Sequence, residues 1–257
     1  MSRTVFNWKI IRTFASEFFV SFLFGFTAYS SGLVVSIESI EAGPILIGLA
    51  LGFSGIALIY SFLDVTVAHF NPAITLSAMV FCKIPFLMGL GFILSRILGF
   101  LAASAIVLGC FSGSSEEILN TILPKPVSDS ISTLNIILTE GMLAGILVFV
   151  AFAVSINKHK KPVHNTVEDD ELLESREDTA PDTTILGPLC IGLTLGFLAL
   201  LGASSSGGAY NPALVFAPVL LTGRWADSWK YWVGEFVGGI LGAVIQILLM
   251  GDIIASY

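Results

Sequence analysis

The sequence predicts an all-α membrane protein with six transmembrane helices and two re-entrant half helices, arranged as an inverted repeat. Three observations support this fold class. Of the 257 residues, 55% are hydrophobic and only 12% are charged, with a mean hydropathy of +0.89, whereas a soluble domain usually carries about 25% charged residues. The apolar residues gather in runs of spanning length, and the tripeptide Asn-Pro-Ala occurs at matching places in the two halves of the chain.

Six segments are long and apolar enough to cross a bilayer, which takes about 20 residues of helix. The run of uncharged residues at 183–223 is 41 residues long, about twice the length of one span, so it must hold a span and a second element. The predicted spans are residues 18–37, 43–63, 84–110, 130–157, the first part of 183–223, and 232–251.

Two short helices are expected to begin at Asn71-Pro72 and Asn211-Pro212, because asparagine is a good N-cap and proline suits the first helical position. Around the first of them, residues 70–82 offer 13 uncharged residues, too few to cross the bilayer and enough for a re-entrant half helix. A broken helix at membrane depth is tolerated where its backbone packs against protein or lines a water-filled cavity. Two such breaks predict a pore.

The two halves share one plan of charged residues and Asn-Pro-Ala boxes. The matched pairs are Glu17 with Glu140, Asn71 with Asn211, and Arg96 with Glu235. Glu17 precedes Asn71 by 54 residues and Glu140 precedes Asn211 by 71, and each glutamate is expected to open its helix. Arg96 follows Asn71 by 25 residues, and Glu235 follows Asn211 by 24. Three spans in each half place the second half in the opposite orientation. We therefore expect one channel domain over residues 1–257, with repeats at about 13–112 and 130–251.

Charge indicates the orientation of the chain. Residues 165–184 contain eight acids and one base, which accounts for the net charge of −7, so a disordered acidic loop is expected at about 157–184. The basic residues at 3–12, 83 and 158–161 fall on one side of the bilayer, which the positive-inside rule makes cytosolic, together with both termini. The negative net charge argues against nucleic-acid binding. The cysteines have no metal-ligand spacing, and no catalytic residue, metal or cofactor is expected.

The residues around the two boxes resemble the major intrinsic protein (aquaporin) family. The resemblance rests on residues 69–75 and 207–213, on the glutamates ahead of them, and on Trp229 and residues 231–234 behind, and it runs from about 15 to 249. It implies six tilted helices and two half helices that meet at the membrane centre. It also implies a homotetramer in membrane lipid, with one passive pore for water and small neutral solutes in each subunit.

The boxes are the expected centre of that pore. Two facing helix N-termini concentrate positive potential, and the asparagine amides can orient a passing water so that it does not relay a proton. The alternative is that the asparagines only cap their helices, although capping requires neither the alanine nor a duplicate box. The box residues are Asn71, Pro72, Ala73, Asn211, Pro212 and Ala213.

Five polar residues are expected to support the boxes from inside the bundle, because charges in lipid are costly. Glu17 and Glu140 should accept hydrogen bonds from the backbone of the re-entrant loops. His69 should hold its loop by a hydrogen bond, with a pH sensor as the alternative. We hypothesise that Arg96 and Glu235 form a buried ion pair between the halves, as opposed to separate partners or snorkelling.

The resemblance assigns a constriction to Leu51, Ala199, Gly208 and Leu214. The family commonly has an arginine three residues after the second asparagine, where it repels cations and narrows the pore, and this chain has Leu214 there. A filter without charge, aromatic ring or imidazole predicts a wide, apolar pore. Such a pore should be permissive to glycerol, urea, ammonia or hydrogen peroxide, and this places strict water selectivity in doubt.

The acidic loop contains Glu168 and the pair Leu172-Leu173, a pattern similar to a dileucine signal read by sorting adaptors, although adjacent leucines also occur by chance. The signal favours an endomembrane or vacuolar membrane over the plasma membrane. Two other functions stay open: a secondary transporter with inverted repeats, which would cycle with an ion, and a closed structural member of the family. An enzyme is disfavoured, because no nucleophile, base and orienting group stand at interpretable spacing.

Overall fold

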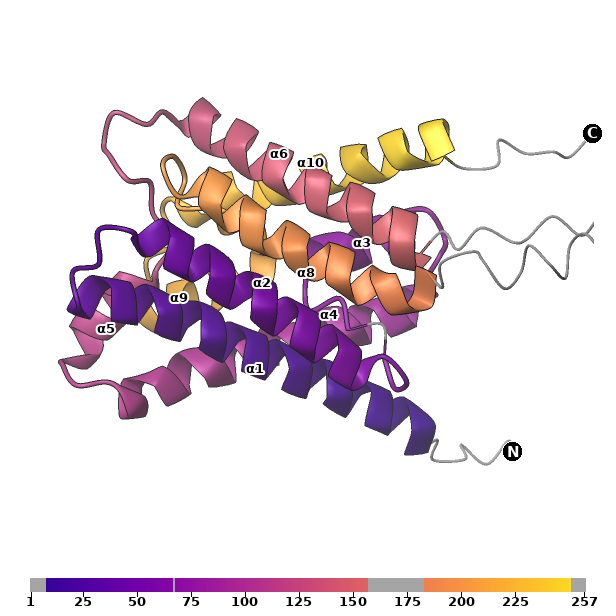
Figure 1. The fold of residues 1–257 in the computed structure, drawn as a ribbon, viewed down its shortest axis with the longest axis horizontal. Coiled ribbons are helices and arrows are strands. Elements are labelled where there is room, and N and C mark those ends of the chain that lie inside the picture. Colours follow the sequence, from indigo (N-terminus) through magenta and orange to yellow (C-terminus); the bar gives the residue numbers. More distant parts are fainter. Residues whose placement is uncertain (1–7, 67, 157–182, 251–257) are drawn as a thin grey trace, which may run out of the picture.

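The computed structural model describes residues 8–66, 68–156 and 183–250, which form a bundle of helices (Figure 1). The described residues contain no strand, and five of their helices are long and apolar enough to cross a membrane. A sixth long helix, α8, completes the bundle. The long helices are α1 (Trp8–Ile37), α2 (Gly43–Phe62), α4 (Phe86–Cys110), α6 (Thr133–Ala151, continued by the π-helical turn η1, Phe152–Ile156), α8 (Thr183–Gly202) and α10 (Ser228–Met250). The predicted all-α class is confirmed.

The glutamates lie well inside their helices, and the expectation that they open them was wrong. Glu17 stands nine residues beyond the first residue of α1, and Glu140 seven residues beyond the first residue of α6. The first predicted span was started at residue 18, just after Glu17, whereas the span predicted at 130–157 already ran through Glu140. A buried charge that has partners does not interrupt the backbone ladder, so the helices continue through both positions.

The two predicted half helices are present. They are α3 (Pro72–Val80) and α9 (Pro212–Thr222), each with proline at its start and an asparagine N-cap. The Asn71 side-chain oxygen accepts a hydrogen bond from the Ala73 backbone at 2.9 Å, and the Asn211 oxygen accepts one from Ala213 at 3.1 Å. These bonds satisfy backbone donors that the first helical turn leaves free.

One helix, α5 (Ser115–Ile122), was not expected. It begins with a capping box in which the Ser114 hydroxyl accepts a hydrogen bond from the Glu117 backbone and the Glu117 carboxylate accepts one from the Ser114 backbone. These hydrogen bonds with Ser114, first from its backbone and then from its side chain, hold the pKa of Glu117 below its ordinary value. The Ser-x-x-Glu pattern was a signal in the sequence for this helix.

Helix packing is similar in the two halves. The most extensive contacts pair α1 with α4, α6 with α10, and α2 with α8. The first two pairs occupy matching places in their halves, and the third joins the halves. Small residues allow the close approach: a Cβ atom on Gly238 of α10 would lie 2.0 Å from the carbonyl oxygen of Gly141 on α6. The single-domain and repeat boundaries stay predictions.

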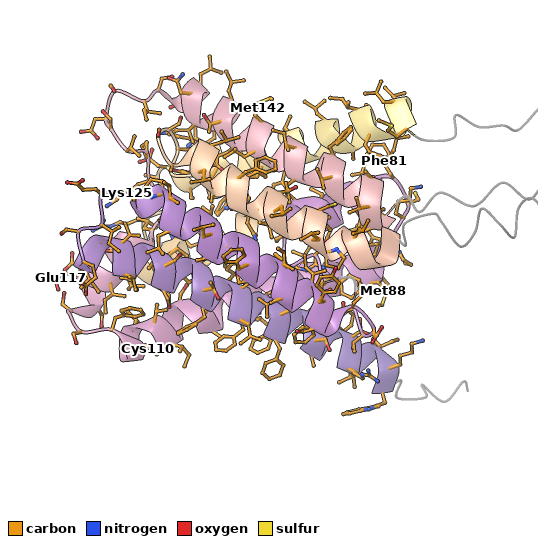
Figure 2. All side chains as sticks on the ribbon, viewed as in Figure 1. Phe81, Met88, Cys110, Glu117, Lys125 and Met142 are labelled. Carbon is orange, nitrogen blue, oxygen red and sulfur yellow. The ribbon has the colours of Figure 1, made fainter. Side chains whose placement is uncertain are left out.

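The two ends of the bundle differ. The beginning of α1, the end of α10 and the facing ends of η1 and α8 gather at one end, here called the inner end, and α5 lies at the opposite, outer end (Figure 1). Phe81 and Met88, on either side of the turn that holds Lys83, are at the inner end, and Glu117 and Lys125 are at the outer end (Figure 2). The acidic loop and the dileucine at 172–173 lie outside the described residues.

Candidate functional site: the two Asn-Pro-Ala boxes and the cavities beside them

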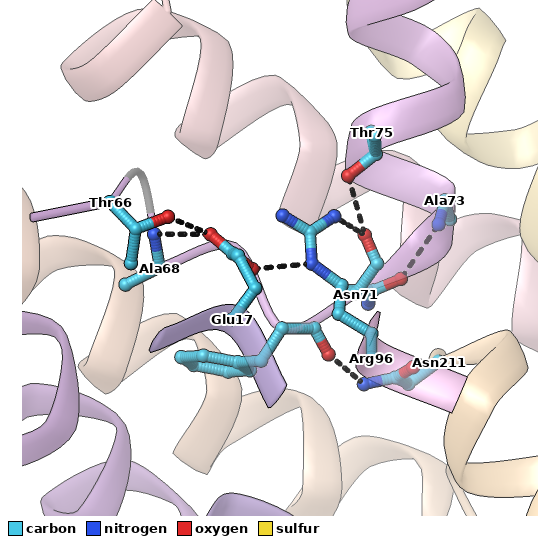
Figure 3. A network of polar contacts seen from close by, with 9 residues as sticks. Glu17, Thr66, Ala68, Asn71, Ala73, Thr75, Arg96 and Asn211 are labelled. Carbon is cyan, nitrogen blue, oxygen red and sulfur yellow. Dashed lines mark hydrogen bonds and ion pairs between the residues drawn. The ribbon is translucent and has the colours of Figure 1, made fainter. Parts of the chain in front are cut away.

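The two box asparagines are linked crosswise. The Asn71 side-chain amide donates to the carbonyl oxygen of Tyr210 at 2.8 Å. The Asn211 amide donates to the carbonyl oxygen of Phe70 at 2.9 Å, and Figure 3 shows this second bond. Each asparagine therefore binds the residue that precedes the other asparagine. Because an amide NH₂ group carries two donor hydrogens, each side chain keeps one for another acceptor.

The backbone before each box is strained. Phe70 has a φ of 32° and Tyr210 a φ of 35°, in the left-handed region that non-glycine residues rarely adopt. Such residues cost about 1–3 kcal/mol each and persist where the surroundings fix them. Here the surroundings are the asparagine amides, which hold the carbonyl groups of these same two residues.

In the first half, Glu17 and Arg96 form a buried ion pair behind the box. Both side chains are fully buried, and the Arg96 Nε atom lies 2.7 Å from the Glu17 Oε2 atom (Figure 3). The other Glu17 oxygen accepts hydrogen bonds from the Thr66 hydroxyl and the Ala68 backbone. Arg96 also donates to the Asn71 carbonyl oxygen at 3.4 Å. The pair thus connects α1 and α4 with the loop that leads into α3.

The predicted ion pair between Arg96 and Glu235 was wrong. Arg96 lies on α4, which packs most extensively against α1 of its own half, and its carboxylate partner is therefore Glu17. Snorkelling is excluded as well, because Arg96 and Glu235 both have an exposed fraction of 0%. Residues at matching positions in two repeats each pack within their own half, so they need not contact each other.

In the second half, two carboxyl groups lie where the first half has an ion pair. Glu140 accepts hydrogen bonds from the Ser206 hydroxyl, from the Ala209 backbone at 3.1 Å and from the Tyr210 backbone at 2.6 Å. Both oxygens of Glu235 are buried and lack a hydrogen bond of normal geometry within the described chain, although the group faces Glu140 and the backbone N–H of Asn211. The halves therefore share a backbone plan and differ in their buried charge.

His69 does not hold its loop in the predicted way. Its side chain is buried, with 4% exposed, and neither ring nitrogen has a hydrogen-bond partner among the residues that the structure describes. The Glu17 carboxylate, which binds Thr66 and Ala68, holds this loop instead. The expectation that His69 fixes the loop by a hydrogen bond was therefore wrong.

Three tyrosines with no predicted role also hold the site. Their hydroxyl groups donate to backbone carbonyl groups: Tyr29 to Leu214 at 2.9 Å, Tyr210 to Leu195 at 2.9 Å, and Tyr231 to Ser206 at 2.7 Å. All three side chains are buried. A tyrosine in the sequence gives no signal for the partner of its hydroxyl group, so these contacts were not predictable.

Cavities lie on both sides of the boxes. The inner cavity, of about 400 Å³, is lined at the inner end by residues that include Thr13, Asp64, Thr66 and Ser155. The outer cavity, of about 240 Å³, is lined at the outer end by residues that include Leu51, Gly208 and Leu214.

The outer cavity brings together three of the four residues predicted to form the constriction. Ala199 does not line it, but its carbonyl oxygen lies 3.5 Å from the place where a Cβ atom on Gly208 would be. Gly208 has a φ of 69°, a left-handed conformation that suits glycine. The Tyr29 hydroxyl fixes Leu214 through its carbonyl group. That these four residues set the width of a filter stays a prediction.

Known proteins are similar to this chain in sequence and in fold. The profile of the family described as "Major intrinsic protein" matches residues 4–246. A protein named "Aquaporin" from Encephalitozoon intestinalis is 42% identical over 94% of this chain and 95% of its own length. "Aquaporin-B" from Dictyostelium discoideum is 35% identical over 93% of this chain and 83% of its own.

A solved structure shows the same fold. It is titled as the aquaglyceroporin from Plasmodium falciparum and superposes with a TM-score of 0.73 at 18% identity, covering 96% of this chain and 97% of that chain. The similarity at this low identity concerns the fold. Together with the family match, it confirms the resemblance expected from the boxes. The chain therefore belongs to the major intrinsic protein family of aquaporin channels, multi-pass membrane proteins that pass water or small solutes and are not enzymes.

Proposed function

We propose that this channel passively conducts small neutral solutes, such as glycerol, urea, ammonia or hydrogen peroxide, as well as water. One observation carries the proposal: Leu214 lines the outer cavity together with Leu51 and Gly208. Leu214 follows Asn211 by three residues, about one turn of α9, so both side chains lie on one face of that helix. Leucine offers no hydrogen bond to replace bulk water, so a solute must keep part of its hydration in a bore of sufficient width.

The boxes supply the polar part of the proposed pathway. The N-termini of α3 and α9 meet where Asn71 and Asn211 are linked, and helix N-termini carry partial positive charge. The amide hydrogen that each asparagine keeps can donate to a water or to a solute hydroxyl. This arrangement favours neutral molecules with acceptor oxygens and disfavours cations and proton relay.

Stopped-flow light scattering on proteoliposomes tests the proposal. Vesicles with the purified protein are compared with protein-free vesicles of the same lipid for water, glycerol and urea permeability. We expect all three to rise above the lipid background. A channel that passes water and excludes glycerol and urea would contradict the solute range, and a protein that passes none of them would be the closed structural member. Saturable flux that depends on an ion gradient would indicate the secondary transporter.

Assembly and location belong to the same proposal. We infer a homotetramer with one pore per subunit. We also infer that both termini lie in the cytosol, on the side of the inner end, because α1 begins there with Lys9 and Arg12 in its first turns and the turn between Phe81 and Met88 holds Lys83. Native mass spectrometry of the detergent-solubilised protein tests the tetramer. We also infer an endomembrane or vacuolar address, read by sorting adaptors from Glu168 and residues 172–173. Alanine at both leucines should move the protein to the cell surface without a change in permeability.

A further inference from the structure

Fourteen of the residues that the structure describes line the outer cavity, and one of them is charged. Lys125 lies around this cavity with Leu51, Gly208 and Leu214. The described lining of the inner cavity also has a single charged residue, the acidic Asp64. The two cavities therefore carry opposite charges at their rims, and the positive one is at the outer end.

The backbone at Lys125 is held against the loop that leads into the second box. Pro124 and Pro126 flank it, and proline fixes its own φ near −65°. The Val127 backbone donates to the Ser205 carbonyl oxygen at 3.1 Å. The Lys125 carbonyl oxygen lies 2.8 Å from the position that a Cβ atom on Gly207 would take. The lysine is thus docked on the segment that also supplies Gly208.

No acid neutralises Lys125 in the described part of the chain. Its ammonium group donates to the Asn120 carbonyl oxygen at 3.5 Å and has no carboxylate within 4.0 Å. The acids of the adjacent α5 have other partners, because Glu117 closes the cap of that helix and Glu116 lies 3.9 Å from Arg224. The side chain is exposed, so water screens part of its charge, and the remaining part is not cancelled by a carboxylate.

We propose that Lys125 is a specificity-determining residue that excludes small cations at the outer cavity and leaves neutral solutes unaffected. This inference rests on the proposed conduction of neutral solutes. Apolar walls such as Leu51 and Leu214 focus the field of a nearby charge, because they do not screen it as water does. The repulsion thus acts before a solute reaches the uncharged filter. A neutral molecule of the same size experiences no such barrier.

Urea and guanidinium test this discrimination, because they are planar molecules of similar size that differ in charge. Influx of each labelled compound is measured in proteoliposomes in which a protease step or an affinity step selects one orientation of the protein. In the Lys125→Met variant we expect guanidinium influx to rise about fivefold, the size expected for one partly screened charge, while urea influx stays within about twofold. Lys125→Glu should raise guanidinium influx further. Arg224→Met is the matched control, because it removes a positive charge at the same end from a residue that does not line the outer cavity.

The outcomes separate this inference from the proposed function. Unchanged guanidinium influx in Lys125→Met, with urea conduction intact, would overturn the role of Lys125 alone. Absence of urea influx in the wild type would refute the proposed function and this inference together. If the variants do not fold, the wild type still decides, because the Debye length falls from about 30 Å at 0.01 M to about 3 Å at 1 M salt. Tracer guanidinium influx should rise over that range, and a constant influx would overturn the inference.

Discussion

The Glu17–Arg96 pair leads to a quantitative prediction about stability. Breaking a buried ion pair by removing one partner costs about 3–5 kcal/mol, because the other charge is left without compensation. In Arg96→Gln the Glu17 carboxylate, now without its ion-pair partner, keeps the Thr66 hydroxyl and the Ala68 amide as donors. We therefore expect a loss of unfolding free energy at the lower end, about 3 kcal/mol.

Glu17→Gln should cost more. The Arg96 guanidinium, now without its ion-pair partner, keeps a hydrogen bond to the Asn71 carbonyl oxygen at 3.4 Å and a cation–π contact with Phe92, whose ring centroid is 5.5 Å away. One long hydrogen bond and one ring contact compensate a buried cation poorly, so we expect about 5 kcal/mol. The double variant leaves neither charge, and its loss should be no more than about 3 kcal/mol, well below the sum of the single losses.

Equilibrium unfolding in mixed micelles with a rising fraction of sodium dodecyl sulfate, followed by tryptophan fluorescence, measures these differences. The matched control is the cycle of Arg96→Gln with Glu235→Gln, which should be additive within about 0.5 kcal/mol because the two residues are not partners. Additive losses for Glu17 and Arg96, or strong coupling between Arg96 and Glu235, would refute the reasoning. Equal losses for the two single variants would contradict the predicted difference between them.

Three further predictions concern the filter, the boxes and the cap of α5. Leu214→Arg should lower glycerol permeability much more than water permeability in stopped-flow assays, because it fills the outer cavity and adds charge. The control Leu214→Met, which conserves volume, should keep the wild-type ratio of glycerol to water permeability. A folded arginine variant with that same ratio would rule Leu214 out of the constriction. Asn71→Asp and Asn211→Asp keep an N-cap acceptor but lose the crosswise donor and place a carboxylate at facing helix N-termini. Cation leak, measured with a potential-sensitive dye, should therefore increase. Wild-type ion rejection in both variants would contradict the role of the boxes. Because the pKa of Glu117 is lowered in the folded protein, its contribution to the stability of α5 is present above the ordinary glutamate pKa and is lost as the pH falls through the folded pKa. Amide hydrogen exchange of α5 should therefore increase over this acid range in the wild type but not in Glu117→Gln.

The sequence was sufficient for the features that depend on local chemistry. Asn-Pro predicted where α3 and α9 begin, because capping and proline geometry act within one turn. The long apolar runs predicted the spanning helices, although the first was started at residue 18 because Glu17, which lies inside α1, was taken as its boundary. α5 was missed because it is short and partly charged, even though the cap formed by Ser114 and Glu117 was visible in the sequence.

The partners of buried groups were less predictable, because they depend on how helices pack. Similar spacing from the boxes in the two repeats indicated that Arg96 and Glu235 are equivalent positions, but equivalence under a repeat does not make two residues neighbours. The proximity of α1 and α4 decides that Arg96 meets Glu17. For the same reason, the sequence did not indicate that Tyr29 fixes Leu214 or that His69 would lack a hydrogen bond.

The crosswise asparagine bonds also bear on how the channel is made. The amide of Asn71 needs a carbonyl group that lies 139 positions later in the chain, and that of Asn211 needs one 141 positions earlier. While only the first half has been synthesised, the Asn71 amide therefore lacks the carbonyl group of Tyr210, and the carbonyl group of Phe70 lacks the amide of Asn211. Completion of the pore is thus a late event, and a nascent chain that holds only the first half lacks one side of both bonds. Until the second loop arrives, the first half cannot form the conducting geometry.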